Sequence, residues 1–255
     1  ILFHLVVLGA IVAMVALGFW QLDRLDERKD FNRQVIERSE QAPLPLDDVL
    51  DAIESGGLTP DDAEWLPVAT TGSYLPDQIV EFNQSQGGRA GENVLSALAL
   101  DDGTTVLVNR GVITLGSPVP DPPATEVTSA GLGRTSEVRG TGGLTDADEG
   151  PVTEVRRIDI PRLTPQLPGD VAPVYVQLVT SDPGIGPTDP EPVVRPELDN
   201  GPHLSYAIQW FVFATCVAIG WVLAVRRSLR TRQRAGRDST DVTGEADERT
   251  PVGSH

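Results

Sequence analysis

Histidine and cysteine are the side chains best suited to metal binding and nucleophilic catalysis, and this chain has few of either. Its three histidines are His4, His203 and His255, and its only cysteine is Cys216. None of these four lies between residues 21 and 202. Serine–histidine–aspartate triads, cysteine–histidine dyads and histidine-ligated hydrolase metals are therefore excluded from that central stretch. Carboxylate pairs stay available there because acids are abundant, but no spacing singles out one pair.

The single cysteine limits redox and thiolate chemistry further. Cys216 has no second cysteine in the chain with which to form a disulfide. The sequence also lacks any C-x-x-C or C-x-x-x-C pair, so two thiolates cannot hold a copper or zinc ion.

His203 is the histidine placed where a ligand could reach it, because it stands at the mouth of an apolar run. A neutral imidazole there can ligate haem iron, or it can simply face water among lipid headgroups. Tyr206, Trp210 and Phe213 follow at helical spacing, and they could flank a flat porphyrin or pack on another helix. His4 cannot supply a second axial ligand, because it lies near the far end of the first apolar segment, roughly a membrane thickness away.

The element that positions His203 is an expected transmembrane helix over residues 203–225. No charge occurs from Leu204 to Val225, and at ~1.5 Å per residue this length matches a hydrocarbon core of roughly 30 Å. Clustered arginine beside a membrane helix marks the cytoplasmic side, so the helix runs inward and His203 lies at its outer end. The arginines that follow are Arg226, Arg227, Arg230, Arg232, Arg234 and Arg237. We expect residues 226–255 to form a basic, then acidic, disordered cytoplasmic tail.

A first transmembrane helix is expected over residues 1–22, with a helical extension over 23–42. A cleaved signal peptide is the competing interpretation, but the apolar run is too long for one and its end is a poor cleavage site. The chain opens on Ile1 rather than methionine, so we expect residues to precede it. Small residues at Gly9, Ala13 and Ala16 could face Ala214 and Ala218 of the second helix and allow close helix packing, or they could simply reflect a high background of alanine.

Two helices with both termini cytoplasmic leave residues 43–202 outside, in one extracytoplasmic domain. The net charge of −17 comes mainly from acids in that domain. An acidic surface disfavours nucleic acid and anionic headgroups, so a protein partner and the lipid bilayer are the expected contacts.

The domain is predicted to be rich in strands. A short helix is expected first, over residues 46–55, and a helical turn at Ile160–Leu167. Asp101-Asp102-Gly103 indicates a hairpin turn. The predicted strands are Trp65–Gly72, Gln78–Phe82, Asn93–Leu100, Thr104–Arg110, Glu137–Leu144 and Val174–Val179. The fold class is therefore an α+β membrane protein, with two transmembrane helices flanking an extracytoplasmic antiparallel β domain, either a barrel or a sandwich.

Four stretches together resemble the surfeit-locus-one family of cytochrome c oxidase biogenesis proteins. They are GFWQLDR from Gly18, LPVATTGSY from Leu66, DGTTVLVNRGVI from Asp102 and PHLSYAIQWF from Pro202. The order and spacing agree with the family over most of residues 17–230. This sequence departs from the pattern by lacking a tryptophan after the W-Q-x-x-R motif and by carrying Val112 where an aromatic residue usually follows V-N-R-G. The motif residues are Trp20, Gln21, Arg24, Gly72, Asn109, Arg110 and Gly111.

The resemblance implies a non-enzymatic assembly factor, or chaperone, in the cell membrane. It implies partners among the subunits of an aa3-type haem-copper cytochrome c oxidase, or a respiratory supercomplex, and help in delivering haem a. His203 is then the candidate contact to haem iron, with Tyr206 and Trp210 beside the ring. Asn109, Arg110 and Gly111 have a structural interpretation instead, as a strand end with a paired arginine and a turn glycine. Two alternatives stay open: a stable structural accessory subunit without haem handling, and an extracytoplasmic enzyme that uses carboxylates.

Overall fold

The computed structural model describes residues 2–137, 146, 150–196 and 198–247, with the backbone alone described from residue 232. The chain divides into two compact units, which are taken here one at a time. One unit combines residues 1–31 with residues 199–255, and the other comprises residues 32–198.

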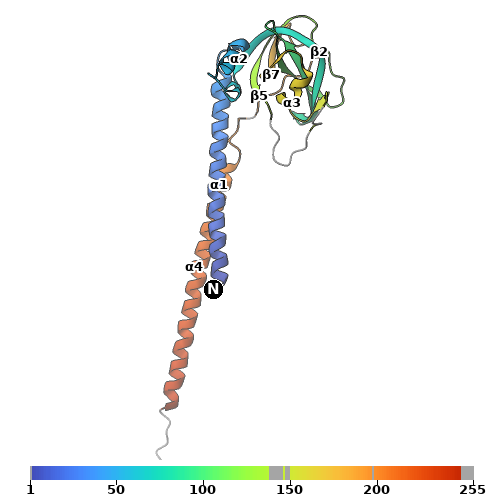
Figure 1. Cartoon of the computed structure of the whole chain (residues 1–255). Helices are drawn as coiled ribbons and strands as arrows, with labels where there is room; N and C mark the ends of the chain where they lie inside the picture. Colours follow the sequence, from blue (N-terminus) through green and yellow to red (C-terminus); the bar gives the residue numbers. More distant parts are fainter. Residues whose placement is uncertain (1, 138–145, 147–149, 197, 248–255) are drawn as a thin grey trace, which may run out of the picture. The chain divides into compact units, whose positions relative to one another are not determined.

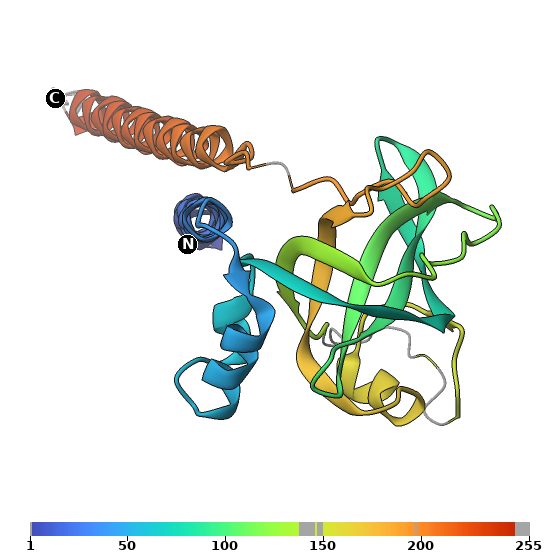
Figure 2. The same cartoon turned by 90° about the horizontal axis from the view of Figure 1, so that it is seen from above.

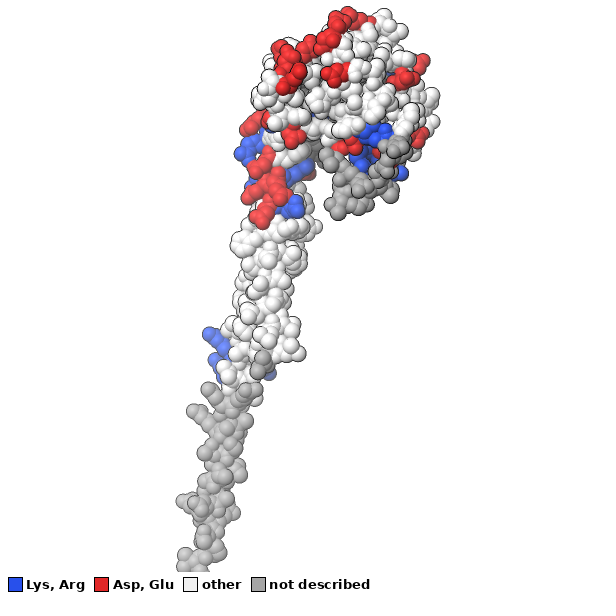
Figure 3. Space-filling view, in the orientation of Figure 1, with Lys and Arg blue, Asp and Glu red and all other residues white. Residues whose placement is uncertain are grey.

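The first unit is built from two long helices, α1 (Leu2–Ser39), of which residues up to 31 belong to this unit, and α4 (His203–Asp247) (Figure 1). By length and composition, α1 and residues 203–231 of α4 can each cross a membrane, with mean hydropathies of 2.5 and 2.0. Their surfaces carry no charge over most of the paired length (Figure 3). Because these helices flank a β domain in the chain, the predicted architecture is confirmed.

The two helices are antiparallel and approach closely at a glycine. A Cβ atom on Gly18 would lie 2.7 Å from the ring of Phe211, so a larger residue there would require this ring to move. On α4, Ala207 and Ala214 are buried.

The predicted set of small residues on α1 was wrong in part. Gly9, Ala13 and Ala16 are exposed, and nothing lies within 4 Å of a Cβ built on Gly9. The face of α1 that packs on α4 is instead the one that carries Gly18, which lies against the ring of Phe211. On α4, Ala214 is buried as expected.

The helix α4 continues well past the apolar segment. The sequence predicts a disordered tail from residue 226, but the structure keeps the chain helical to Asp247. Arginine, which makes up half of residues 226–237, is a good helix former, and adding a turn to an existing helix needs no new nucleus.

The second unit is a β barrel with short helices. Its strands lie in the order β2-β3-β4-β7-β5, and β2 also pairs with β5, which closes the ring (Figure 2). The short strands β1 and β6 each add to β2. The strands are β1 (Leu44–Pro45), β2 (Pro67–Gln86), β3 (Arg89–Ala99), β4 (Thr104–Thr114), β5 (Val127–Thr135), β6 (Glu154–Val155) and β7 (Asp170–Asp182). The helices are α2 (Leu46–Glu54) and α3 (Ile160–Leu163), with 3₁₀ turns at Pro60–Ala63 and Thr164–Gln166.

The sheet is mixed rather than wholly antiparallel. The pairs β2–β3, β3–β4, β5–β7 and β2–β5 are antiparallel, but β4 and β7 run parallel. A parallel pair needs a long crossover, and the chain makes one through β5, β6 and α3 before it returns beside β4.

Most predicted strands are present with longer bounds. Trp65–Gly72 and Gln78–Phe82 are parts of one strand, β2, which shifts register between Tyr74 and Gln78. The predicted strand Glu137–Leu144 lies outside the described residues apart from Glu137, which is not in a strand. The expected turn at residues 101–103 joins β3 to β4, with Gly103 at φ +92°.

The strand β5 was not predicted, and its composition explains why. Its sequence, VTSAGLGRT, is rich in small residues that have weak strand preference. The glycines are needed because a Cβ on Gly131 would collide with the backbone carbonyl of Gln177, and one on Gly133 would lie 2.5 Å from the carbonyl of Ala63.

Two buried clusters cover opposite faces of the central strands. Val106 and Val174 belong to the first, which also includes residues of α2. Leu107 and Tyr175, the next residues along each strand, belong to the second, which includes residues of α3. Because successive side chains point to opposite faces, β4 and β7 are buried on both sides.

Candidate functional site

The first candidate site is the contact between the beginning of α4 and α1. The Nδ1 atom of His203 lies 2.9 Å from the side-chain oxygen Oε1 of Gln21, and both side chains are half-buried. Gln21 comes from the W-Q-x-x-R motif and His203 from the P-H-L-S-Y motif. The structure therefore brings together two motifs that are separated by most of the chain.

The turn before α4 is tied to α1 at a second point. The backbone carbonyl of Asp199 accepts a hydrogen bond from Arg28 Nε at 3.0 Å, and its side chain accepts one from the backbone N–H of Gly201 at 3.2 Å. Gln21 and Arg28 are seven residues apart, which places them on the same face of α1. The same face of α1 thus holds both the turn and the histidine that follows it.

Gly201 controls the space beside the His203 ring. Its φ of +63° lies in the left-handed region that favours glycine. A Cβ at this position would lie 3.2 Å from Cδ2 and 3.3 Å from Nε2 of His203, closer than ordinary van der Waals contact. Glycine therefore leaves the Nε2 edge of the ring open on that side.

The aromatic residues after His203 lie along α4 with much of their surface exposed. Tyr206 and Phe213 are 48% and 44% exposed, and Trp210 is half-buried with its ring edge-on to Phe213 at 6.2 Å. The exposed parts of Tyr206 and Phe213 are open to a ligand or to lipid, so both interpretations of this stripe remain predictions.

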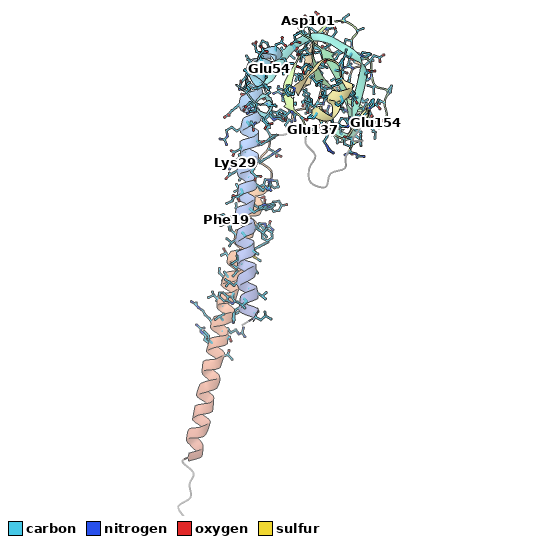
Figure 4. The ribbon with its side chains drawn as sticks, in the orientation of Figure 1. Phe19, Lys29, Glu54, Asp101, Glu137 and Glu154 are labelled. Carbon is cyan, nitrogen blue, oxygen red and sulfur yellow. The ribbon has the colours of Figure 1, made fainter. Side chains whose placement is uncertain are left out.

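The other members of the W-Q-x-x-R motif lie on the surface of α1. The guanidinium of Arg24 stands 5.7 Å from the centre of the Trp20 ring, one helical turn away, and it also pairs with Glu27 at 2.6 Å. Trp20 itself is exposed. The apolar part of α1 around Phe19 gives way to charged residues such as Lys29 over this interval (Figure 4).

The remaining histidines are not part of this site. His4 accepts a hydrogen bond from Trp221 Nε1 at 2.8 Å, near the other end of the helix pair. Trp221 stands eighteen residues after His203 along α4, which is roughly 27 Å at 1.5 Å per residue. This separation agrees with the expectation that His4 cannot share a ligand with His203. His255 lies outside the described residues.

The V-N-R-G motif lies inside the β domain. Arg110 is 3% exposed in its side chain and pairs with Asp189 at 3.1 Å. Its guanidinium also donates to the side chain of Gln78 and to the backbone carbonyls of Pro120 and Asp121. Burial lowers the pKa of Arg110, and the negative charge of Asp189 opposes this effect. Arg110 thus fastens two loops, around residues 120 and 189, to β4.

Asn109 and Gly111, which flank Arg110, also help to hold the loop around residue 190 against β4. Asn109 Oδ1 accepts a hydrogen bond from the backbone N–H of Gly111 at 3.1 Å. Gly111 has φ +132°, and a Cβ on it would collide with the backbone carbonyl of Glu191, which pairs with Val112. Gly72 is needed for a similar reason, because a Cβ there would collide with the carbonyl of Ala99 on β3.

Comparison with known proteins agrees with the motifs. The model of the SURF1 family matches residues 8–215, which run from Leu8 in α1 through the whole β domain to Thr215 in α4. SURF1-like proteins of Mycobacterium bovis and of two Mycobacterium tuberculosis strains are each 31% identical over 231 residues, or 88% of this chain and 82% of theirs. The chain belongs to the SURF1 family. This family is linked to the assembly of cytochrome c oxidase, as the resemblance implied.

The β domain of this SURF1 chain also holds a carboxylate pair that the sequence did not single out. Glu81 is 3% exposed and accepts a hydrogen bond from Asn93 Nδ2 at 2.7 Å. Burial raises the pKa of Glu81 to about 7, and the nearby carboxyl of Glu137 adds to the rise. The sequence could have indicated that Glu81 is buried, because side chains alternate between the faces of a strand and Glu81 therefore lies on the same face as the buried Ile79. The pair can hold a proton at neutral pH.

A second feature of the SURF1 β domain is an acidic groove of about 350 Å³ at the end that carries Glu54 and Asp101 (Figure 4). Among the described residues that line it, no lysine or arginine occurs. Burial raises the pKa of Asp47, and the carboxylates of Asp102 and Asp51 raise it further. The acidic residues that line the groove are Asp47, Asp51, Glu54, Asp102 and Asp170. Such a surface repels phosphate-bearing polymers.

Proposed function

We propose that this SURF1-family protein is an assembly factor for an aa3-type haem-copper cytochrome c oxidase, and that it receives haem a as cargo at His203. The observation that carries the proposal is the pairing of His203 with Gln21. It joins the two helix motifs of the family resemblance around a side chain that can ligate iron. The family's link to oxidase assembly supplies the partner.

The residues present fit a haem on three counts. Nδ1 of His203 is engaged by Gln21, so Nε2 is the nitrogen that can act as an axial donor. Gly201 leaves room beside Nε2. Tyr206 and Trp210 lie one and two helical turns below His203, and Tyr206 is exposed, so their rings can lie against a porphyrin placed at that helix face. In this proposal the protein binds and orients the cargo and does no chemistry on it.

The proposed location is the cell membrane, with both helices spanning it, the β domain extracytoplasmic and both termini cytoplasmic. The support is the length of the two apolar helices and the arginines that follow Val225. Protease added to intact spheroplasts should digest the β domain. If the domain is cut only after lysis, this orientation is wrong.

The oxidase proposal is tested by isolating tagged protein in mild detergent and recording both its subunit partners and its visible spectrum. We expect oxidase subunits in the eluate together with haem absorbance. His203→Ala should lose the haem absorbance and lower the haem a content of the oxidase. His4→Ala is the matched control, since it removes a helix-pair histidine far from the site, and it should change neither quantity.

The alternative function is a stable structural accessory subunit of the oxidase or of a respiratory supercomplex. It is favoured by the large apolar side chains that α1 and α4 leave exposed, because these can pack on other membrane helices as well as on lipid. Stoichiometric recovery in the mature complex, with wild-type oxidase haem in His203→Ala, would establish this alternative. Recovery without any oxidase subunit would exclude both functions.

A further inference from the structure

We infer that Gln21 is a positioning residue for His203: its side-chain oxygen holds the imidazole proton on Nδ1 and so presents Nε2 as the free donor. The inference rests on the proposed function for the identity of the cargo, haem a. The tautomer of His203 is independent of the proposed function, because it can be measured without any ligand.

The partner of Nδ1 determines which tautomer of the ring is favoured. An amide oxygen only accepts hydrogen bonds, so from Oε1 of Gln21 at 2.9 Å we infer that the Nδ1 atom of His203 is the donor. A neutral imidazole carries one N–H. Its other nitrogen, Nε2, then has an unprotonated lone pair, which is the form that ligates a metal.

The scaffold around this bond is suited to holding the ring still. Gln21 stands on α1, and α1 also holds the turn before His203 through Arg28 and Asp199. The ring is therefore held at its Nδ1 edge by Gln21. The backbone just before it is held at Gly201, whose N–H donates a hydrogen bond to the side chain of Asp199. A hydrogen bond to the non-ligating nitrogen is the contact that orients histidine ligands in metal sites and tunes their basicity.

The Nε2 edge of the ring lies beside Gly201. A Cβ built on Gly201 would stand 3.3 Å from that nitrogen, so glycine keeps this side of it free of a side chain. Gln21 and Gly201 thus have separate roles: one fixes the proton and the other keeps the donor accessible. Replacing Gln21 changes the first property and leaves the second intact.

The first test uses the full chain without haem in detergent micelles, labelled with ¹⁵N-histidine. The signals of the three histidines are assigned from single alanine variants. We expect the proton of neutral His203 on Nδ1 in the wild type and in Gln21→Glu, which keeps an acceptor oxygen. In Gln21→Met, which has nearly the same shape but no such acceptor, the Nε2–H form should become populated.

Gln209→Met is the matched control, because it removes a second, exposed amide from the helix pair. It should leave the His203 signals unchanged. A wild-type His203 that is protonated on Nε2 overturns the inference, as does a Gln21→Met spectrum identical to the wild type.

The second test adds haem a to the same proteins and follows binding by the Soret band and the midpoint potential. Loss of such an outer contact typically weakens metal binding by about 10–100-fold, so Gln21→Met should bind at least about tenfold more weakly. Gln21→Glu should retain binding with a lower potential, because a carboxylate makes the imidazole a stronger donor. A residue with only a packing role would not shift the potential in this way.

The two proposals fail differently. If His203 carries its proton on Nδ1 as expected but the wild type takes up no haem, the haem proposal is wrong and the positioning of the ring stands. If the wild type binds haem and Gln21→Met binds it equally well with the same potential, Gln21 is not a positioning residue and the haem proposal stands.

Discussion

The V-N-R-G motif of the β domain and the His203–Gln21 contact of the helix pair differ in whether their polar atoms are all hydrogen-bonded. In the β domain, Arg110 is buried, and its guanidinium forms an ion pair and donates hydrogen bonds to a side-chain amide and two backbone carbonyls. In the helix pair, His203 is half-buried, with one ring nitrogen bonded to Gln21 and the other without a hydrogen-bond partner among the described residues. A fully engaged group holds a fold together, whereas a group with one oriented free atom can bind something else.

The same contrast applies to the glycines of the two regions. Gly111 allows a loop to approach β4, and the contact it permits is already filled by Glu191. Gly201 keeps space next to His203, and that space borders the free nitrogen. The comparison predicts that changes in the β-domain motif act through stability, while changes at the helix junction act through binding.

The largest expected effect comes from Arg110→Ala. It leaves Asp189 and two carbonyls without their partner, so the free energy of unfolding should fall by about 3–5 kcal/mol. The measurement is denaturant unfolding of the full chain in detergent, followed by near-UV circular dichroism. Arg89→Ala is the control: Arg89 pairs with Glu191 on the same loop at 3.2 Å, but both side chains are exposed, and its loss should cost under about 1 kcal/mol. An Arg110→Ala protein of normal stability that fails to support the oxidase would break the comparison.

The next effect is the pH dependence of the β domain. Because the folded-state pKa of Glu81 is raised from 4.5 to about 7, the folded chain keeps a proton that the unfolded chain loses. The stabilisation is therefore fully present below pH 4.5 and is lost as the pH rises through 7, with a total of about 3 kcal/mol. Glu81→Gln should remove this slope when stability is measured between pH 4.5 and 8. An unchanged slope in the variant would show that Glu81 is not the group responsible.

A smaller effect is expected for Gly111→Ala. Both Gly111 and Gly103 have positive φ, at +132° and +92°, but a Cβ on Gly103 has nothing within 4 Å. We expect Gly103→Ala to cost about 1 kcal/mol from backbone strain alone and Gly111→Ala roughly 1–2 kcal/mol more. Equal losses of stability in the two variants would mean that the approach of Glu191 does not constrain residue 111.

The sequence predicted the elements that depend on local pattern. Two uncharged apolar runs and the arginines after Val225 predicted the helices, and the Asp101–Gly103 turn predicted the β3–β4 hairpin. Strand β5 was missed because its glycines serve contacts with other segments, which have no local signal.

The candidate site was predictable only in part, for the same reason. His203 could be chosen from its place at the start of an apolar run. Its partner Gln21 could not, because their contact depends on the register of an antiparallel helix pair. The pairing of Glu81 with Glu137 likewise depends on the folding of β2 against a distant segment.

The smallest effect on stability is expected at the junction itself. His203→Ala removes one half-buried hydrogen bond, so the unfolding free energy should fall by only about 0.5–1.5 kcal/mol. The same variant should lose haem binding altogether, which no β-domain variant of comparable stability should do. The check is to measure unfolding and Soret absorbance on the same preparations of His203→Ala and Gly103→Ala, whose expected losses of stability are similar. If both variants lose haem to the same extent, haem retention follows stability rather than the free nitrogen of His203, and the distinction between the two clusters fails.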